Sequence, residues 1–452
     1  MSGQTADLAF AFADHVSARR YEDLPATGLE RTRALILDTV AAGIAGSSAE
    51  GIAAGLAYVR AAGGAAQAGV LVFGDRLPAG SAAFLNGTLF QARDFDPVYE
   101  PGVMLPYGPV VAAALAAGQL AGASGRELLA AIVLGTDLAC RVGRALTGGL
   151  GWSRSATLGA FGAAAAAARL LRLDRERTVH ALGLALSQSA GNIQTVLDGS
   201  LAKRFQGGFA AEAGVKAARL ALLGVTGPVN VFEGRFGFFN LYESGGYRRE
   251  RALEGLGETC VGAEASVKPY PCAREHHGAI AAALALHAGG ARGAGVDAVR
   301  VTLPPNAHSL SGRPLPPDRG PTVGAAIGSA AYGVAVALLQ GRVGIGDFEP
   351  QAVARPEVLA LARRIEVRVD PAVADARTLV PQSVELRAGG EARSETCRAM
   401  PGSPEAPLTA AQSAAKLADC VAHAALPMDG ERVRAAVEGL EALPDVRDLQ
   451  FG

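Results

Sequence analysis

The sequence predicts a mainly α protein, in which a large all-α helical domain built from both termini carries an inserted, smaller α+β domain. Three observations predict this plan. Small residues dominate, since 58 of the 452 residues are Gly, runs of Ala such as 163–168 recur, and only 5% are aromatic; small side chains let helices approach closely. Apolar residues recur at helical spacing before residue 264. Strand-like alternation is confined to 264–405.

The predicted boundaries are 1–263 for the N-terminal part of the helical domain, 264–405 for the α+β domain and 406–452 for the C-terminal part of the helical domain. In the first part, Thr27 and Glu30 fit a capping box, which places a helix start at Thr27. The short run 70–73 is β-like and precedes a turn. Further helices are predicted over 49–62 and 81–93.

The middle of the chain combines an irregular loop with long Ala-rich helices. The loop covers 94–109 and mixes prolines with polar residues, and loops between rigid helices commonly carry chemistry. Two charge-free stretches, 102–124 and 321–341, are interpreted as buried helices rather than membrane spans, because Gly and Pro interrupt them and basic flanks are missing. The helices expected after the loop are 110–122, 126–147, 155–171, 174–190 and 206–223.

Strands and helices alternate in the predicted inserted domain. Alternating polar and apolar residues predict strands over 297–303, 365–369 and 383–387. Helices are predicted over 274–288, 323–340 and 356–363. Helical patterning resumes at Ala410, and Val433, Val437 and Leu440 mark one face of the last helix.

The charge balance and the cysteines limit the class of protein. Lys and Arg number 42 against 43 Asp and Glu, a formal net charge of −1. This balance excludes a generic nucleic-acid binder, which needs many phosphate contacts. The five cysteines are scattered, with no C-x-x-C spacing, which favours a reduced, cytoplasmic protein. We therefore expect no nucleic-acid or membrane partner.

Two motifs place ionisable groups in otherwise apolar surroundings. Asp94-Phe95-Asp96 pairs two carboxylates beside an aromatic ring, an arrangement suited to acid–base or orienting work. The alternative is that they cap the next helix or face water. Tyr332 lies in an apolar, small-residue helix and needs a partner for its hydroxyl group. The alternative there is a core tyrosine bonded to a backbone carbonyl.

Two further motifs concentrate positive charge. Ser200 and Lys203 have the S-x-x-K spacing of serine acyl-transfer enzymes, although the companion K-T-G and S-D-N motifs are absent. Alternatively, Lys203 and Arg204 hold a substrate carboxylate. The segment 268–277 joins a lysine and two prolines to a predicted helix start, which favours anions. Its Glu-His-His run lacks the i, i+4 spacing of metal ligands, and a turn with a surface His is the plain alternative.

Taken in order, these segments resemble the MmgE/PrpD family, which includes 2-methylcitrate dehydratase, cis-aconitate decarboxylase and iminodisuccinate epimerase. Residues 77–88 resemble its helix before the loop, 94–96 its D-F-D-D loop, 202–204 its A-K-R segment and 268–272 its K-P-Y-P-C motif. The resemblance covers most of the chain. It implies a helical domain with an α+β lid domain, a homodimer, and no metal or organic cofactor.

The resemblance also implies roles for individual residues around a small anionic substrate. The catalytic residues would be Asp94, Lys203, Lys268, His277 and Tyr332. The substrate-binding residues would be Arg204, Arg274, Tyr107, Ser153 and Gln206. Lys203 and Lys268 would hold or polarise carboxylates, with Arg204 and Arg274 as helpers, while Asp94, His277 and Tyr332 would line a pocket between the domains.

The chain departs from the family pattern at three positions where the family has His, which are Leu105, Ser153 and Gln206. Leucine cannot transfer a proton, so Lys203, Lys268 or His277 must act as base, or a tyrosine must be strongly tuned. The predicted function is a cofactor-independent lyase or isomerase that acts by proton transfer next to a carboxylate of a small di- or tricarboxylate. The alternatives are an epimerase of an amino- or imino-dicarboxylate and a non-catalytic binding protein on the same fold.

Overall fold

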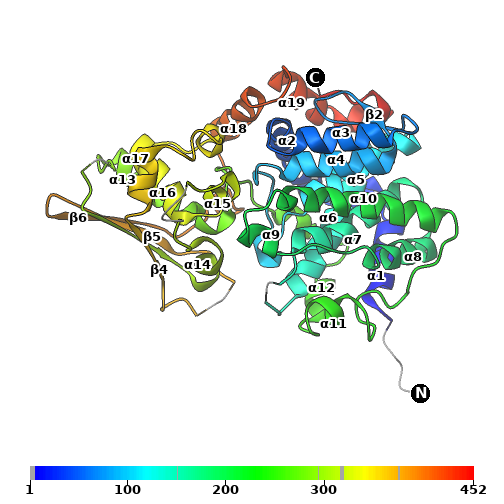
Figure 1. The fold of residues 1–452 in the computed structure, drawn as a ribbon. Helices are drawn as coiled ribbons and strands as arrows, with labels where there is room; N and C mark the ends of the chain where they lie inside the picture. Colours follow the sequence, from blue (N-terminus) through cyan, green and yellow to red (C-terminus); the bar gives the residue numbers. More distant parts are fainter. Residues whose placement is uncertain (1–5, 150, 294, 316–319, 375–376, 452) are drawn as a thin grey trace.

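Helices make up most of the chain in the computed structural model, which describes residues 6–149, 151–293, 295–315, 320–374 and 377–451 (Figure 1). The prediction of a mainly α protein is confirmed. The helices before residue 264 are α1 (Leu8–Ala18), α2 (Ala26–Gly46), α3 (Ile52–Ala62), α4 (Ala79–Gln91), α5 (Tyr107–Ala121), α6 (Gly125–Ala145), α7 (Arg154–Leu170), α8 (Arg175–Leu186), α9 (Gln194–Leu197), α10 (Ala202–Leu222), α11 (Phe238–Tyr242) and α12 (Arg249–Leu253).

The later part of the chain holds most of the strands. Its helices are α13 (His277–Ala288), α14 (Pro305–Ser311), α15 (Val323–Ile327), α16 (Ala330–Gln340), α17 (Pro356–Ala362), α18 (Ala410–Ala422) and α19 (Gly430–Glu438). Its strands are β3 (Ala298–Leu303), β4 (Ile365–Val369), β5 (Gln382–Ala388) and β6 (Glu391–Cys397). The short strands β1 (Ala68–Gly69) and β2 (Arg76–Leu77) pair antiparallel near the N-terminus.

Helix α10 lies at the centre of the helical part and packs against α4, α5, α7 and α8. Most of its buried residues are Gly and Ala, which brings the helix backbones close together. The C-terminal helices α18 and α19 return to pack on the N-terminal helix α2 (Figure 1). One continuous hydrophobic core joins all of these helices.

A second hydrophobic core belongs to a four-stranded sheet with the order β4-β3-β5-β6. Strand β3 pairs parallel with β4, with Val299 opposite Ile365, and antiparallel with β5. Helices α13 and α16 pack on each other and on the sheet, and α17 packs on α16 (Figure 1). The predicted boundaries at 263/264 and 405/406 enclose this second core but stay a prediction.

Two predictions near the N-terminus are wrong in detail. The helix expected to start at Thr27 begins at Ala26 with Pro25 at its N-cap, so Thr27 lies in the first turn and caps nothing. Proline suits this place because it already has a fixed φ. The β-like run 70–73 is a turn, in which Val72 has a φ of 70°. The pairing strand β1 lies just before it.

Two predictions in the later part also need correction. The helix expected over 323–340 is broken into α15 and α16, because the Ser329 hydroxyl group accepts a bond from the Tyr332 backbone N–H and starts a new helix. Strand β6 was not predicted. It is an edge strand whose side chains are mostly exposed and polar, so it lacks the alternation that marks a half-buried strand.

The two charge-free stretches form buried helices, as predicted. Stretch 102–124 contains α5 and stretch 321–341 contains α15 and α16, and most of the side chains of α5 and α16 are buried. Among the residues described, no helix is both long and apolar enough to cross a membrane. The five cysteines are free thiols.

Gly208→Ala is expected to destabilise the protein because α10 and α4 touch backbone to backbone. A Cβ atom at Gly208 would lie well under 3.0 Å from the Thr88 hydroxyl oxygen and the Phe84 carbonyl oxygen. Overpacking of this kind costs about 1–3 kcal/mol, so urea unfolding should show a lower free energy of unfolding. Gly80→Ala in α4 is the matched control, because its nearest neighbour would be Glu212 Cγ at 3.6 Å. Equal losses in both variants would contradict this packing.

Candidate active site

The loop that carries Asp94, Phe95 and Asp96 follows α4 directly. Asp94 has a φ of 53°, in the left-handed region that residues other than Gly enter at a cost. Arg93 ties the base of the loop to the end of α2, because its Nε donates to the Ala45 carbonyl at 2.6 Å and its Nη2 donates to the Ser48 hydroxyl at 2.7 Å. Outliers of this kind often occur at functional sites.

Three of the five predicted catalytic residues meet at this loop. Lys203, from the first turn of α10, has its Nζ 2.9 Å from Asp94 Oδ1. Lys268, from the loop before α13, has its Nζ at 2.9 Å from the same oxygen and also donates to the Asp94 carbonyl at 3.0 Å. The Lys268 side chain is 1% exposed, whereas that of Lys203 is 27% exposed. We call these three residues the Asp94 cluster.

The two ammonium groups fix the charge state of the cluster. Burial alone would raise the pKa of Asp94, but Lys203 and Lys268 outweigh it and hold that pKa far below its usual range. Burial would lower the pKa of Lys268, but Asp94 and Asp96 outweigh it and raise that pKa. Asp94 is therefore a carboxylate and Lys268 an ammonium group at any pH near neutrality.

Asp96, the second acid of the loop, has a different environment. It is fully buried, and within the described part of the chain neither carboxyl oxygen has a hydrogen-bond partner. Burial raises its pKa to about 7, with Lys268 opposing the shift and ionised Asp94 adding to it. Asp96 therefore titrates near neutral pH, next to a carboxylate that does not.

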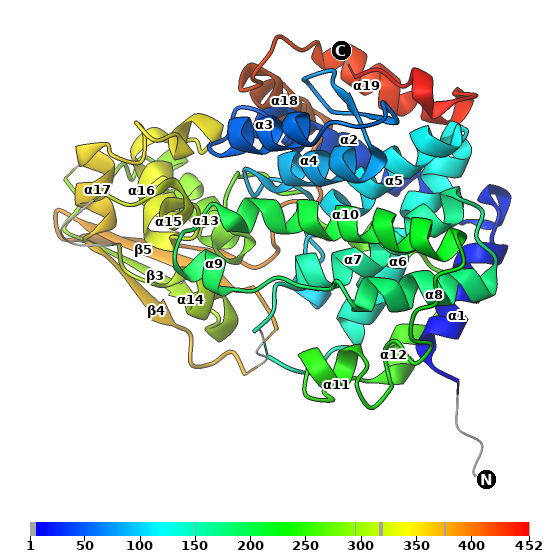
Figure 2. The same cartoon turned by 45° about the vertical axis from the view of Figure 1, so that its right-hand side comes forward.

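Two adjacent cavities, of about 150 and 130 Å³, are both lined by Asp94 and Lys203. The first lies between the start of α10 and the segment that contains α15. The second extends towards Lys268 and the start of α7. Helices α9 and α15 lie beside each other at this place in both views (Figure 1 and Figure 2). Both cavities are also lined by Val196, Ala273 and Gly328.

Four of the five predicted substrate-binding residues line these cavities. Arg204 lines the first, and its Nη1 donates to the Glu50 carbonyl at 2.5 Å. Arg274, Ser153 and Gln206 line the second. The Gln206 side chain is already engaged, because its Oε1 accepts from the Asn192 backbone N–H at 2.8 Å and its Nε2 donates to Thr195. Gln206 therefore fixes the loop before α9.

Tyr107, His277 and Tyr332 are not among the described residues that line either cavity. The Tyr332 hydroxyl donates to the Asp347 carbonyl at 2.7 Å, and that of Tyr107 to the Gly262 carbonyl at 3.0 Å. Burial raises the pKa of Tyr332 to about 12 and lowers that of His277 well below its usual value.

Contacts within the protein also occupy the ring of His277. Its Nδ1 lies 3.4 Å from Arg274 Nη1 and its Nε2 lies 3.2 Å from the Cys272 carbonyl oxygen. Neighbouring His276 lies instead against the Ser311 hydroxyl, at 3.1 Å. In the part of the chain that is described, no three His, Cys, Asp or Glu side chains gather closely enough to hold a metal ion.

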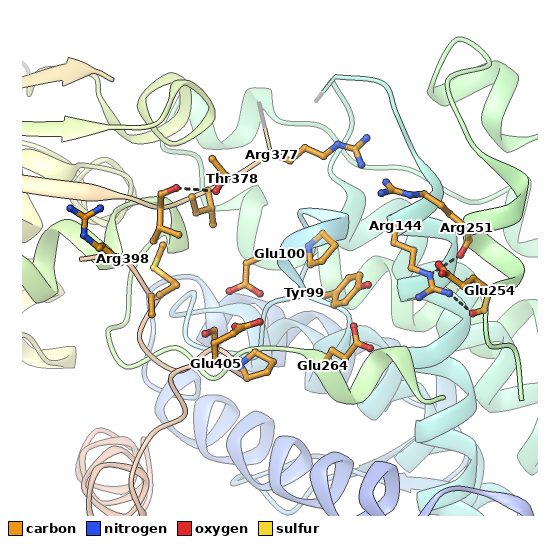
Figure 3. A pocket seen from close by; sticks show the side chains of 17 residues that line it. Tyr99, Glu100, Arg144, Arg251, Glu254, Glu264, Arg377, Thr378, Arg398 and Glu405 are labelled. Atoms are coloured by element: carbon orange, nitrogen blue, oxygen red, sulfur yellow. Dashed lines mark hydrogen bonds between the residues drawn. The ribbon is translucent and has the colours of Figure 1, made fainter. Parts of the chain in front are cut away.

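A larger cavity, of about 930 Å³, lies elsewhere and is shown in Figure 3. It is lined by both arginines and glutamates, including Arg144, Arg251, Arg398, Glu254 and Glu405. The Arg144 side chain is bonded to backbone carbonyls of α12 and the residue after it (Figure 3). Because its charges are mixed and it is an open groove rather than a closed site, size alone does not make it the site of chemistry.

An ion pair between buried Arg274 and half-buried Glu100 lies between this groove and the Asp94 cluster. Glu100 lines the groove, while Arg274 lines the second small cavity. The Arg274 Nε donates to Glu100 Oε1 at 2.9 Å, and its Nη1 donates to the Pro401 carbonyl at 2.6 Å. Nε and Nη1 of Arg274 are therefore already bonded, while its buried Nη2, 2.8 Å from Glu100 Oε1, has no hydrogen-bond partner among the described residues.

Ser200→Ala is expected to keep activity within about threefold, because a hydrogen bond within the chain already engages the Ser200 hydroxyl. Ser200 lies before α10, which begins at Ala202, and it lines the first cavity together with Lys203. The Ser200 hydroxyl accepts a bond from the Ala202 backbone N–H at 3.2 Å, as a capping residue does. Steady-state kinetics and an acyl-phosphonate probe test this. Covalent labelling of Ser200 would restore the acyl-transfer hypothesis.

Some residues of the site have little signal in the sequence. Asp96 is visible only as the second acid of a motif, and no pattern tells a buried carboxylate from a solvated one. Val196, Ala273 and Gly328 line both cavities but carry no chemical group that would attract notice. The basic residues, in contrast, stand out because charged side chains are rare in these Ala-rich segments.

Fold and site together define a class: a mainly α protein in which a carboxylate held by two lysines faces a small cavity. Comparison with protein families agrees with this class. The MmgE/PrpD N-terminal domain matches residues 11–250, and the MmgE/PrpD C-terminal domain matches residues 270–442. The chain belongs to the MmgE/PrpD family, as its motifs predicted.

Several relatives of known name cover most of the chain. A cis-aconitate decarboxylase-like protein of Aspergillus oryzae is 30% identical, over 76% of this chain and 76% of the relative. A cis-aconitate decarboxylase of Aspergillus terreus is 28% identical, over 80% of this chain and 78% of its own. The human cis-aconitate decarboxylase is 26% identical, over 80% of this chain and 76% of the relative.

Proposed function

We propose that the protein is a cofactor-independent lyase that acts by proton transfer next to a carboxylate of a small di- or tricarboxylate. The observation that carries the proposal is the place of Asp94 between Lys203 and Lys268, where two cavities meet. The relatives named cis-aconitate decarboxylases support this class. Loss of CO₂ from a polycarboxylate is the reaction that we put first.

Charge and size favour a small anion. Two lysines against one aspartate leave the Asp94 cluster with excess positive charge while Asp96 is protonated, and such a site attracts carboxylates. Arg204 adds a second cation at the first cavity. The cavities, of about 150 and 130 Å³, are smaller than the roughly 300–1,000 Å³ that drug-sized ligands occupy. A substrate of a few carbons with several carboxylates suits both properties.

The charge states divide the roles. Asp94 cannot serve as a base, because its pKa lies far below neutrality; it orients the two lysines. Lys268 stays charged and faces the negative charge that develops on the substrate. When the bond to a departing carboxylate breaks, the electron pair stays on carbon and CO₂ leaves. Lys203 gives that carbon a proton and regains one from solvent, which reaches its 27% exposed side chain.

An isomerase or epimerase is the second candidate, favoured by the wall of the second cavity. Leu105, Ser153 and Gln206 line it, and they stand where the family resemblance predicts histidines. Without those imidazole groups, Lys203 and Lys268 are the proton carriers that remain at the Asp94 cluster. They are suited to a reaction that removes one proton from a carbon atom and returns one to the same atom. A binding protein without catalysis is the outcome if neither reaction occurs.

The arrangement of the chain belongs to the same proposal. We infer that 264–405 forms a lid domain over the helical domain, and two separate hydrophobic cores support this. Both cavities take residues from each part, which suits closure around a substrate and exclusion of water. The family resemblance extends the proposal to a homodimer in the cytoplasm.

Proton NMR in D₂O tests the proposed function. The purified protein is mixed with cis-aconitate, citrate, 2-methylcitrate, iminodisuccinate, malate and aspartate in turn, and labelled carboxyl groups report released CO₂. A product one carbon shorter that carries deuterium supports the decarboxylase. New vinyl signals without CO₂ indicate a dehydratase. Loss of an α-proton signal with the skeleton intact favours the isomerase. Unchanged spectra for every compound would contradict catalysis on this class.

A further inference from the structure

Lys416, on the returning helix α18, reaches into the Asp94–Asp96 loop from the far end of the chain. Its side chain is 4% exposed. Its Nζ donates to the Phe95 carbonyl at 2.9 Å, lies 4.0 Å from the centroid of the Phe95 ring, and pairs with Asp38 Oδ1 at 2.7 Å. One ammonium group thus holds both the backbone and the ring of the residue between the two acids of the motif.

A buried lysine is costly unless its charge is paired and bonded. Lys416 satisfies that condition with Asp38 of α2 and with the loop itself. Among the described residues it lines neither small cavity, so it has no contact with the space we assign to the substrate. Its direct contact with the loop is through Phe95, which lies between Asp94 and Asp96.

The loop needs such support because Asp94 is held in the left-handed region. Strained backbone persists only where its surroundings fix it strongly. Arg93 anchors the side before Asp94, through Ala45 and Ser48. Lys416 is the anchor on the side after it. A small shift of Phe95 would move Asp94 Oδ1 away from both lysines, each of which lies 2.9 Å from it.

We propose that Lys416 is a positioning residue, whose ammonium group fixes the Asp94–Asp96 loop so that Asp94 can hold Lys203 and Lys268 in their reactive places. This inference rests on the proposed function. A competing explanation is that Lys416 serves only to neutralise buried Asp38. Asp38 has no other ion-pair partner among the described residues, and its Oδ2 has no hydrogen-bond partner there. The two explanations differ in what happens when Asp38 loses its charge too.

The test compares Lys416→Met, the double variant Lys416→Met/Asp38→Asn, and Val437→Ala. The single variant leaves Asp38 charged and buried alone, so its Tm falls. The double variant has no unpaired charge, so its Tm recovers. If Lys416 positions the loop, kcat stays about 10- to 100-fold below the wild-type value in both variants, and KM changes less than about threefold. Misplacing reactive groups by about 1 Å lowers the rate by a factor of that size. Val437→Ala, in the core of α19, lowers Tm and leaves kcat unchanged.

Recovery of kcat together with Tm in the double variant would overturn the proposal, since neutralising Asp38 would then be the whole role of Lys416. A second readout needs no substrate. Amide hydrogen exchange of the loop over 93–98 should become at least tenfold faster in the double variant and stay unchanged in Val437→Ala. Unchanged exchange in the double variant would overturn the positioning role, even if the wild-type protein turns over a polycarboxylate. Faster exchange with an inactive wild type would leave the positioning role standing and reject the proposed function alone.

Discussion

Lys203→Met is expected to lower kcat/KM for a polycarboxylate by about 10³ while Tm changes little. Positioned acid–base groups contribute about 10²–10⁴ to rate, and Lys203 is the proton carrier that lines both cavities. Its side chain is 27% exposed, and the residue lies in the first turn of α10. The variant therefore keeps the packing of α10. Methionine keeps most of the stem and removes the charge. Steady-state kinetics and thermal unfolding measure the two effects.

Lys216→Met is the matched control for this variant. Lys216 lies on the same helix, with a side chain that is 55% exposed and 3.9 Å from Glu212. Exposed pairs of this kind contribute little to stability, and Lys216 lines neither small cavity among the residues described. Equal loss of activity in the two variants would show that positive charge on α10, and not the Asp94 cluster, matters.

Asp96→Asn is expected to change how stability depends on pH. Burial raises the pKa of Asp96 to about 7 in the folded protein, against about 3.9 in an unfolded chain. Protonated Asp96 therefore adds to the free energy of unfolding. This contribution is fully present below about pH 4 and is lost as pH rises through about 7. Asparagine stays neutral throughout. The free energy of unfolding of Asp96→Asn relative to wild type should therefore rise by roughly 2.5 kcal/mol from pH 5 to pH 8.

The same variant should alter the pH dependence of catalysis. Above about pH 7, ionised Asp96 adds negative charge beside the Asp94 cluster, so the wild-type KM for a polycarboxylate should increase. Asp96→Asn should show a much flatter KM across pH 6 to pH 8. Asp75→Asn is the control, because Arg60 lowers the pKa of Asp75 and no titration falls in this range. Parallel pH profiles for wild type and Asp96→Asn would contradict the titration of Asp96.

Helical spacing and small-residue composition predict most of the fold correctly. The errors arise where one local contact decides an element. Proline at position 25 moves a helix start, the Ser329 hydroxyl divides one expected helix into two, and a polar edge strand such as β6 has no pattern to detect. These contacts depend on neighbours in space, which periodicity along the chain does not describe.

The site was predictable to the extent that its chemistry is carried by charged motifs. Asp94, Lys203 and Lys268 stand in three separate motifs and meet within 3 Å of one oxygen. His277 and Tyr332 also stand in motifs, yet contacts with backbone carbonyls already occupy their polar atoms. Lys416 belongs to no motif, and its contact with Phe95 joins residues 321 positions apart. Only the folded chain reveals which polar groups remain for a substrate.

Calorimetric titration with tricarballylate, a saturated tricarboxylate, shows where a polycarboxylate binds. We expect it to bind at the Asp94 cluster and not in the larger groove of Figure 3. Wild type and Arg398→Ala, altered in the groove, should bind with equal affinity, whereas Lys203→Met should bind at least tenfold more weakly. Unchanged binding in Lys203→Met with loss of binding in Arg398→Ala would contradict the account and move the site to the groove.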